Sequence, residues 1–224
     1  LTTNATSYKS LLDAIDVYVL PITNPDGYVY TWTTDRMWRK TRSGPRKTCY
    51  GVDPNRNFNF KWMVAGASND PCSEEYAGPS PASEIEVQNL QNFWGANNKT
   101  IQSVFDIHTY SEDFMYPYGY AEGAVPPDVT KIKALAAQAT QAVNSAHGEH
   151  FQYGAIFDIV YPASGSTIDY TRAINNIDYS YAMELRPDGN ADNGFVLPED
   201  QILDGASEAW AGISTVFQRV ASGQ

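Results

Sequence analysis

Short apolar runs alternate along the chain with segments whose apolar residues recur at helical spacing, and this alternation restricts the fold more than any other feature. Runs of strand-like length cover residues 15–22, 101–108, 153–161 and 178–185. Amphipathic patterns cover residues 128–146 and the segment that follows Pro198. Because such alternation is typical of helices packed on both faces of a sheet, we predict an α/β fold with a largely parallel or mixed sheet.

The segments between these elements carry turn and cap signals. Residues 24–27 (Asn-Pro-Asp-Gly) follow the first apolar run and predict a turn. Residues 33–80 are rich in glycine, proline, asparagine and charge, which indicates long loops of the kind that are usually functional. Ser83 and Glu86 have the spacing of a capping box and predict that a helix begins there.

Length and charge limit the organisation and the partners. The chain has 224 residues and a net charge of −11 at pH 7. This length suits one domain, so residues 1–224 are expected to lie in a single domain. The acidic charge argues against nucleic acid as a partner, because nucleic-acid binding needs basic side chains that displace counterions. No apolar run is long enough to cross a bilayer, so we expect no membrane partner.

Two cysteines and two glycosylation sequons bear on the compartment. Cys49 and Cys72 lie in the polar, turn-rich region and are either one disulfide or two unrelated buried thiols. The sequons at Asn4 and Asn98 favour secretion and predict a glycoprotein. We therefore expect an extracellular protein, with a vacuolar or lysosomal location as the alternative that the acidic composition suggests.

Two ionisable residues lie at the ends of apolar runs, where the active sites of α/β sheets form. Glu184 either pairs with nearby Arg186 or acts as a general base with a raised pKa. His108 is either a core histidine or a metal ligand. His147 and His150 have the i, i+3 spacing of a metal-binding pair. A glycine follows the helical pattern there, however, so we predict a polar loop.

Arginines concentrate in two loop segments. Residues 37–47 hold five of the fifteen basic residues and form either a solvated loop or a patch that binds anions. Residues 53–57 (Asp-Pro-Asn-Arg-Asn) place an arginine among amides, where its guanidinium could hold a carboxylate in a bidentate fork.

Taken in order, these segments resemble the carboxypeptidase A/B family of zinc metallocarboxypeptidases, from near residue 15 to the C-terminus. The matching motifs cover residues 23–27, 36–43, 51–57, 107–111, 116–120, 161–169, 184–186 and 194–198. The resemblance implies a mixed parallel and antiparallel sheet with helices on both faces. It also implies that this chain is the larger C-terminal portion of the catalytic domain, without the first strands and helix.

The resemblance assigns catalytic roles to three residues. His108 would be a ligand of one Zn²⁺ ion. Glu184 would be the base that takes a proton from zinc-bound water, which zinc acidifies. Arg39 would stabilise the oxyanion that develops as the peptide bond is attacked.

The resemblance also implies how a substrate is held. Asn55, Arg56 and Tyr161 would bind the free terminal carboxylate, which makes the partners peptide or protein C-termini and the activity that of an exopeptidase. Asp53 would orient a zinc-binding histidine. The two cysteines fall where the family has its loop disulfide.

Specificity follows from the residues that would line the substrate cleft. Ile168 would lie at the bottom of the pocket for the terminal side chain, which implies a preference for aromatic or aliphatic ends. Tyr110 and Phe195 would contact residues further along the substrate. Further expected wall residues are apolar: Met115, Ile156, Val160, Ala163 and Ala182. Ser166 would narrow this pocket or bias it towards smaller aliphatic ends, and Asp169, whose direction cannot be read from the sequence, leaves the preference open.

The chain departs from the family in its zinc ligands. The other two ligands come from a His-x-x-Glu motif upstream, and this chain has no histidine before His108. It is therefore a nicked enzyme, a piece of a longer chain, or a zinc-free domain that binds peptide C-termini without cleaving them. We favour the first two, because a pure binding module has no use for Glu184. We expect an N-terminal fragment of the same enzyme as a partner, supplying two further ligands from a segment before Leu1.

Overall fold

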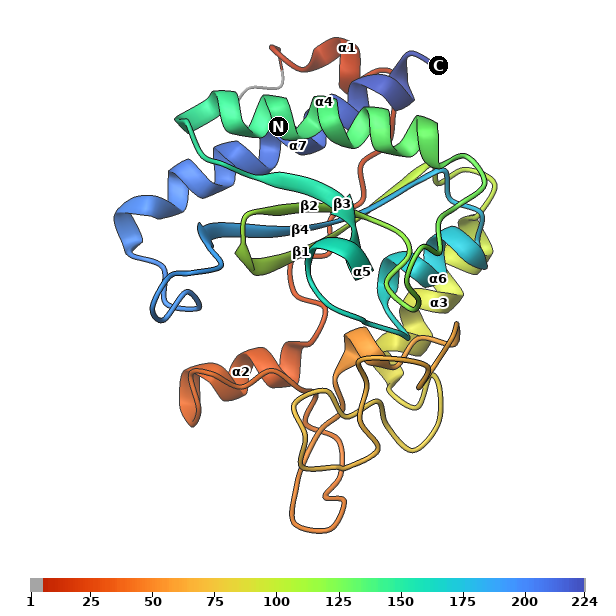
Figure 1. The fold of residues 1–224 in the computed structure, drawn as a ribbon, viewed down its shortest axis with the longest axis vertical. Coiled ribbons are helices and arrows are strands. Elements are labelled where there is room, and N and C mark those ends of the chain that lie inside the picture. The colour runs from red at the N-terminus through yellow and green to blue at the C-terminus, as the bar shows by residue number, and fades with distance from the viewer. Residues whose placement is uncertain (1–5, 224) are drawn as a thin grey trace.

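The structure, a computed structural model, describes residues 6–223 and contains one four-stranded sheet within them (Figure 1). Its strands are β1 (Ser103–Ser111), β2 (Asp113–Tyr116), β3 (Gln152–Ala155) and β4 (Tyr179–Asp188). Their order in space is β1-β4-β2-β3. β1 is parallel to β4 and β2 is parallel to β3, whereas β2 and β4 are antiparallel. The predicted mixed sheet is confirmed.

Helices cover both faces of this sheet (Figure 1). The longer ones are α3 (Ile85–Asn97), α4 (Val129–His147), α6 (Thr167–Ala173) and α7 (Ile202–Ala221). α4 and α7 pack against each other over one face, and α6 packs on the opposite face with α3 beside it. The predicted layers are therefore present.

The central strands are buried on both sides, which explains their apolar sequences. Phe114, Tyr181 and Met183 point towards α4 and α7 and belong to the largest core cluster. Met115 and Ala182, one residue further along their strands, belong to a separate cluster on the other face. Side chains alternate between faces along a strand, so each face receives its own core.

The helix predicted over residues 128–146 ends as the sequence indicates. Ile132, Leu135 and Val143 are buried on one face of α4. Gly148 follows the last helical residue with φ of 82°, a left-handed conformation that glycine adopts without steric cost. The segment after His147 therefore forms the predicted loop.

A loop region extends from residue 34 to residue 84 and forms the lower part of the molecule in Figure 1. It follows α2 (Pro25–Thr33) and contains the short helix η1 (Pro54–Arg56). A disulfide between Cys49 and Cys72, with Cα atoms 5.2 Å apart, links two of its turns. The long loops predicted here are confirmed, and so is the cysteine pairing.

Three short helices complete the described chain: α1 (Lys9–Leu12), α5 (Ile156–Ile159) and η2 (Glu199–Gln201). Within residues 6–223, no helix is both long enough and apolar enough to span a membrane. Of the two sequons, the one at Asn98 is exposed directly after α3, and the one at Asn4 lies outside the described residues.

The strand predicted over residues 15–22 is not formed. This segment is irregular, and Tyr18, Val19 and Leu20 are 69%, 74% and 58% exposed. A strand needs a neighbour to satisfy its backbone groups, and no strand within residues 6–223 pairs with it. The turn predicted after it is also wrong, because Asn24 instead caps α2 by accepting a hydrogen bond from the Gly27 amide.

Two further local predictions were wrong. A helix does begin where it was predicted, since α3 starts at Ile85, but the capping box is not formed, because Ser83 uses its hydroxyl to contact Asn57 and Glu84. The strand expected over 153–161 stops at Ala155, where the chain turns into α5. In the first case a tertiary contact, the hydrogen bond from Asn57 to the Ser83 hydroxyl, replaces the cap.

Candidate active site

His108 and Glu184 lie side by side towards the carboxyl ends of the parallel strands β1 and β4. They are direct partners in the β1–β4 register, and Glu184 is also the partner of Asp113 on β2. Partner residues project from the same face of a sheet. The three side chains therefore form a polar row on the face opposite α4 and α7.

Asp106 holds the imidazole of His108, and the side-chain amide of Asn55 lies beside it. Its Nε2 lies 2.9 Å from Oδ2 of Asp106 and 3.3 Å from Nδ2 of Asn55, and the His108 side chain is 25% exposed. Burial lowers the pKa of His108, but the charge of Asp106 and its hydrogen bond outweigh burial and raise the pKa to about 9. Because a carboxylate accepts hydrogen bonds, Nε2 carries a proton.

Glu184 is not paired with Arg186, which binds Glu208 instead. The Oε2 atom of Glu184 is shielded from solvent and has no hydrogen-bond partner among residues 6–223. Burial raises the pKa of Glu184 to about 7, against the opposing charges of His108 and Arg39. An unengaged carboxylate oxygen with a proton affinity near neutrality is suited to general-base chemistry.

Arg39 is anchored by Asp53. Nε and Nη2 of Arg39 donate to Oδ2 of Asp53 at 3.1 and 2.8 Å. The Asp53 side chain is 2% exposed and that of Arg39 is 36% exposed, so the guanidinium faces outwards from a fixed base. The charge of Asp53 raises the pKa of Arg39 further, which keeps it cationic. The role predicted for Asp53 towards a zinc-binding histidine stays a prediction.

The three residues predicted to bind a carboxylate lie together. Oδ1 of Asn55 accepts hydrogen bonds from the amide and hydroxyl of Thr167 at 2.8 and 3.0 Å. Arg56 is buried and donates from Nε to the Gly66 carbonyl at 2.6 Å and from Nη1 to the Asn55 carbonyl at 2.9 Å. Its guanidinium lies 5.7 Å from the centroid of the Tyr161 ring, and Tyr161 is 49% exposed.

The predicted wall residues of the side-chain pocket form one apolar cluster. Ile168 is 1% exposed. Its cluster contains Met115, Ile156, Ala163 and Ala182, with Ile159 and Val160 packed against it. The sequence left open how Asp169 affects the preference for the terminal residue. In the structure its carboxyl group is held by the backbone, because both of its oxygens accept from the Gly119 amide at 3.1 Å. Burial raises the pKa of Asp169 to about 7.

Tyr110 and Phe195 meet although they are far apart in the sequence. Their ring centroids are 4.9 Å apart in an edge-to-face arrangement, with an interplanar angle of 86°. Nη2 of Arg36 donates to the Phe195 carbonyl at 2.8 Å. This contact ties the loop before Arg39 to the segment that follows β4.

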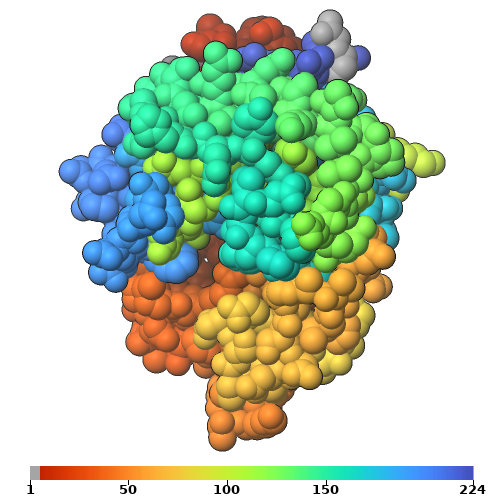
Figure 2. Space-filling model, in the orientation of Figure 1, coloured from red at the N-terminus to blue at the C-terminus, as the bar shows by residue number. Residues whose placement is uncertain are grey.

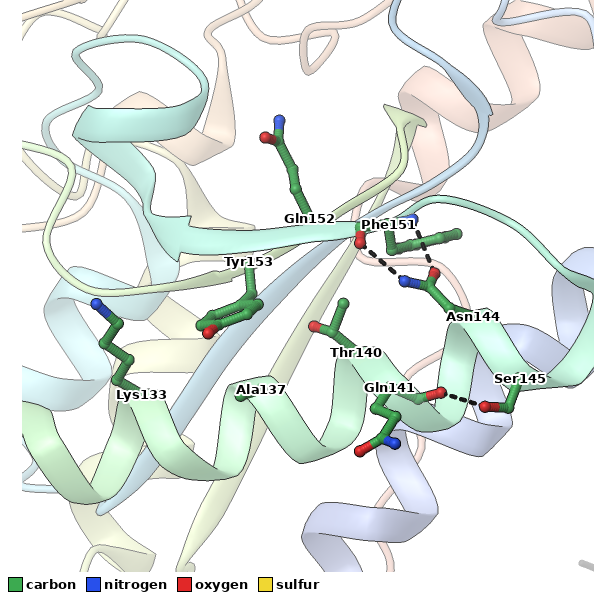
Figure 3. Close-up of a pocket in the computed structure, with 9 residues that line it drawn as sticks. All are labelled: Lys133, Ala137, Thr140, Gln141, Asn144, Ser145, Phe151, Gln152 and Tyr153. Carbon is green, nitrogen blue, oxygen red and sulfur yellow. Dashed lines mark hydrogen bonds between the residues drawn. The ribbon is translucent and has the colours of Figure 1, made fainter.

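The surface is hollowed where the loops around residues 20–50 meet the segments around residues 150–160 and 185–200 (Figure 2). A separate pocket of about 680 Å³ lies between α4 and β3, and no predicted site residue lines it. Its lining, drawn in Figure 3, consists of Lys133, Ala137, Thr140, Gln141, Asn144, Ser145, Phe151, Gln152 and Tyr153.

Sequence reasoning missed the carboxylates that surround His108 and Glu184. Asp106 lies two residues before His108 on β1, a spacing that places both side chains on one face of a strand, so a signal was present. Asp113 lies beside Glu184 only because β2 folds back antiparallel to β4. Nothing in the local pattern indicates that pairing.

The residues present fit part of a zinc site. Catalytic zinc takes three protein ligands and leaves one position open. Within residues 6–223 there is no group of three or more His, Cys, Asp or Glu side chains that could hold a metal ion. His108 does have the carboxylate partner that metal-ligating histidines have, and the adjacent Glu184 has an unengaged oxygen. These residues could therefore supply one ligand and a base, and the role of each is an expectation from the family resemblance.

Known proteins match this chain over nearly all of its length. The model of the zinc carboxypeptidase family matches residues 1–212. Carboxypeptidase A2 of Mus musculus is 44% identical over 212 residues, which cover 94% of this chain and 50% of that protein. Carboxypeptidase B of Rattus norvegicus is 44% identical over 213 residues, covering 95% and 50%. This chain thus spans about half the length of the curated relatives it matches.

The comparison with solved structures agrees with the comparison of sequences. The solved structure of bovine thrombin-activatable fibrinolysis inhibitor in complex with tick carboxypeptidase inhibitor matches with a TM-score of 0.92 and 36% identity. The match covers 99% of this chain and 75% of that one. The family resemblance drawn from the ordered motifs is thereby confirmed, and the chain belongs to the zinc carboxypeptidase family.

Proposed function

We propose that this chain carries the substrate-binding and base residues of a zinc-dependent exopeptidase that hydrolyses the C-terminal peptide bond of peptides and proteins. One observation carries the proposal. His108, with its carboxylate partner, and Glu184, with an unengaged oxygen, are direct partners at the carboxyl ends of two parallel strands. A domain that only captured peptide C-termini would have no use for a carboxylate kept in this state.

His108 is the zinc ligand that this chain supplies. Its Nε2 is engaged by Asp106, which leaves Nδ1 as the nitrogen that would hold the metal. Two further ligands come from a segment before Leu1. Zinc, when bound, lowers the pKa of its water so that hydroxide is available near neutral pH.

The remaining catalytic work falls to Glu184 and Arg39. Oε2 of Glu184 takes the proton of the attacking water, since burial has raised its proton affinity and no hydrogen bond competes for it. The exposed end of Arg39 stabilises the oxyanion, and Asp53 keeps its guanidinium in place while charge develops.

Binding of the substrate's terminal carboxylate restricts cleavage to chain ends. Nδ2 of Asn55 and the guanidinium of Arg56 donate to the terminal carboxylate, and the exposed Tyr161 closes over it. Charge-assisted hydrogen bonds of this kind are strong and directional. A peptide bond in the middle of a chain offers no carboxylate and is not held.

The apolar cluster around Ile168 sets the preference for aromatic or aliphatic terminal side chains. Asp169 does not counter it, because its carboxylate is buried against the Gly119 amide. Tyr110 and Phe195, in edge-to-face contact, line the cleft for the preceding substrate residues.

The proposed partner within the enzyme is its own N-terminal fragment. Tyr18, Val19 and Leu20 are exposed, and so is Ile107 on the edge strand β1. Bare apolar residues at a sheet edge invite pairing with another strand. An oxidising extracellular location, with a vacuolar or lysosomal one as the alternative, agrees with the Cys49–Cys72 disulfide.

The decisive experiment uses the full enzyme with zinc. Peptides that end in Phe, Leu or Lys are incubated with it, with and without a zinc chelator, and released amino acids are quantified. We expect release of Phe and Leu well above Lys, lost on chelation and restored by zinc. Binding of peptide C-termini without any release would contradict the proposal, and chelator-resistant cleavage would contradict the zinc mechanism.

A further inference from the structure

The guanidinium of Arg42 lies against three aromatic rings. Its Cζ atom is 3.7 Å from the ring centroid of Tyr30, 4.3 Å from that of Trp38 and 4.8 Å from that of Tyr50. None of the ion pairs formed within residues 6–223 involves Arg42. Aromatic faces therefore hold this cation in place of a carboxylate, by cation–π attraction and planar stacking. We call these four residues the Arg42 clamp.

The clamp lies in the same loop as Arg39. Residues 34–84 contain no helix or strand other than η1, so side-chain contacts decide where Arg39 lies. Trp38 precedes Arg39 directly, and its Nε1 donates to the carbonyls of Lys40 and Thr41 at 2.6 and 3.3 Å. The backbone directly after Arg39 is therefore bound to the same indole that contacts the Arg42 guanidinium.

The other two rings tie this loop to its surroundings. Tyr30 belongs to α2, and Asn24 at the start of that helix donates from Nδ2 to the Lys40 carbonyl at 2.9 Å. Tyr50 follows the disulfide cysteine, and the next amide, that of Gly51, donates to the Ser43 carbonyl at 2.8 Å. The clamp thus joins α2, the loop and the disulfide-bonded segment at one cation.

We propose that Arg42 is a positioning residue that fixes the backbone of Arg39, so that the Arg39 guanidinium meets the oxyanion in the transition state. The inference rests on the proposed function of Arg39. Asp53 fixes the guanidinium at one end, and the clamp fixes the chain from which it extends. Both are required, because a misplacement of about 1 Å in a catalytic group costs on the order of 100-fold in rate.

The first test replaces Arg42→Lys in the full, zinc-loaded enzyme, which keeps the charge and removes the planar stack. We expect kcat to fall about tenfold with KM changed less than about twofold, because Arg39 acts in the transition state. Arg219→Lys on α7 is the matched control and should leave both constants unchanged. An unchanged kcat in Arg42→Lys, with an active wild type, would overturn the inference alone. An inactive wild type would overturn the proposed function and this inference with it.

The second test separates positioning from a general loss of structure. Arg42→Lys is added to an Arg39→Met variant. If Arg42 acts through Arg39, the second substitution has no further effect on kcat, whereas independent effects multiply. Multiplied effects would overturn the inference.

If Arg42→Lys does not fold, as judged by its thermal unfolding midpoint, variants of Tyr50 provide the test instead. Tyr50→Phe keeps the ring and should retain wild-type kcat, and Tyr50→Leu should lower kcat severalfold without changing KM. Equal kcat values for these two variants would overturn the inference.

Discussion

The protonation states of individual ionisable side chains in this molecule follow from their immediate surroundings. Burial raises the pKa of Glu184, and the charge of the neighbouring Asp53 keeps Arg39 cationic. His108 gains its proton affinity from Asp106. Substitutions that keep the shape of a side chain and change its charge or acceptor are therefore the informative ones.

Replacing Glu184→Gln should remove the base without changing the shape of the site. We expect kcat to fall by about 10²- to 10⁴-fold with KM little changed, because an amide cannot take a proton from water. Steady-state kinetics on a peptide ending in Phe would measure this. Glu122→Gln, at an exposed loop position, is the control and should behave as wild type. Retention of more than about a tenth of wild-type kcat in Glu184→Gln would rule out this base.

Replacing Ile168→Asp should reverse the preference for the terminal residue. Ile168 is only 1% exposed, so a carboxylate there would be buried. It would have no partner when the substrate ends in an apolar residue, and it would form an ion pair when the substrate ends in Lys or Arg. The measured quantity is the ratio of kcat/KM for peptides ending in Phe and Lys. Ile168→Val, which keeps an apolar floor, should keep the wild-type order, and a folded Ile168→Asp enzyme with that same order would contradict the pocket assignment.

The sequence was informative about residues whose neighbours are close in the chain or implied by the family. His108 and Glu184 were each predicted to lie at a strand end, where the active sites of α/β sheets form, and in the structure they are direct partners. The alternative pairing of Glu184 with Arg186 failed, since a carboxylate on α7, Glu208, takes the guanidinium. No local pattern could reveal a partner supplied by a distant helix.

At the scale of elements, the loop region 34–84 depends on cross-links rather than on regular structure. Its disulfide joins residues separated by 23 positions. Replacing Cys49→Ser and Cys72→Ser together should lower the free energy of unfolding by about 3 kcal/mol, because the unfolded chain regains the entropy of the open loop. Urea unfolding of the full enzyme under non-reducing conditions measures this loss. Thr48→Ser, at an exposed neighbouring position, is the control, and equal stability of the double variant and wild type would contradict the prediction.

Helices were predicted more reliably than strands. The patterns for α4 and α7 extend over about five turns, so chance agreement with a helical period is small. The run 15–22 is apolar, but strand formation depends on a neighbour that local sequence does not specify. Likewise β3 stops at Ala155 because the chain turns into α5 there, although the apolar character continues.

For the molecule as a whole, the site depends on segments that only the complete fold brings together. Arg39 belongs to the loop region below the sheet, Glu184 to a central strand and Tyr161 to the segment before α6 (Figure 1). Asp169 joins α6 to the segment after β2, since it lies in the first turn of α6 and accepts a hydrogen bond from the Gly119 amide. Global stability and site geometry are therefore coupled through this buried carboxyl.

Asp169 should make the stability of the whole molecule depend on pH. Burial raises its pKa from 3.8 to about 7, so the folded state holds a proton that the unfolded state releases between these values. The stabilisation is complete below the unfolded pKa and is lost as pH rises through the folded pKa. Asp169→Asn, neutral at every pH, should flatten the fall in unfolding free energy between about pH 4 and pH 7. Urea unfolding across this window measures it, with exposed Asp192→Asn as the control, and an unaltered slope in Asp169→Asn would show that another group holds the proton.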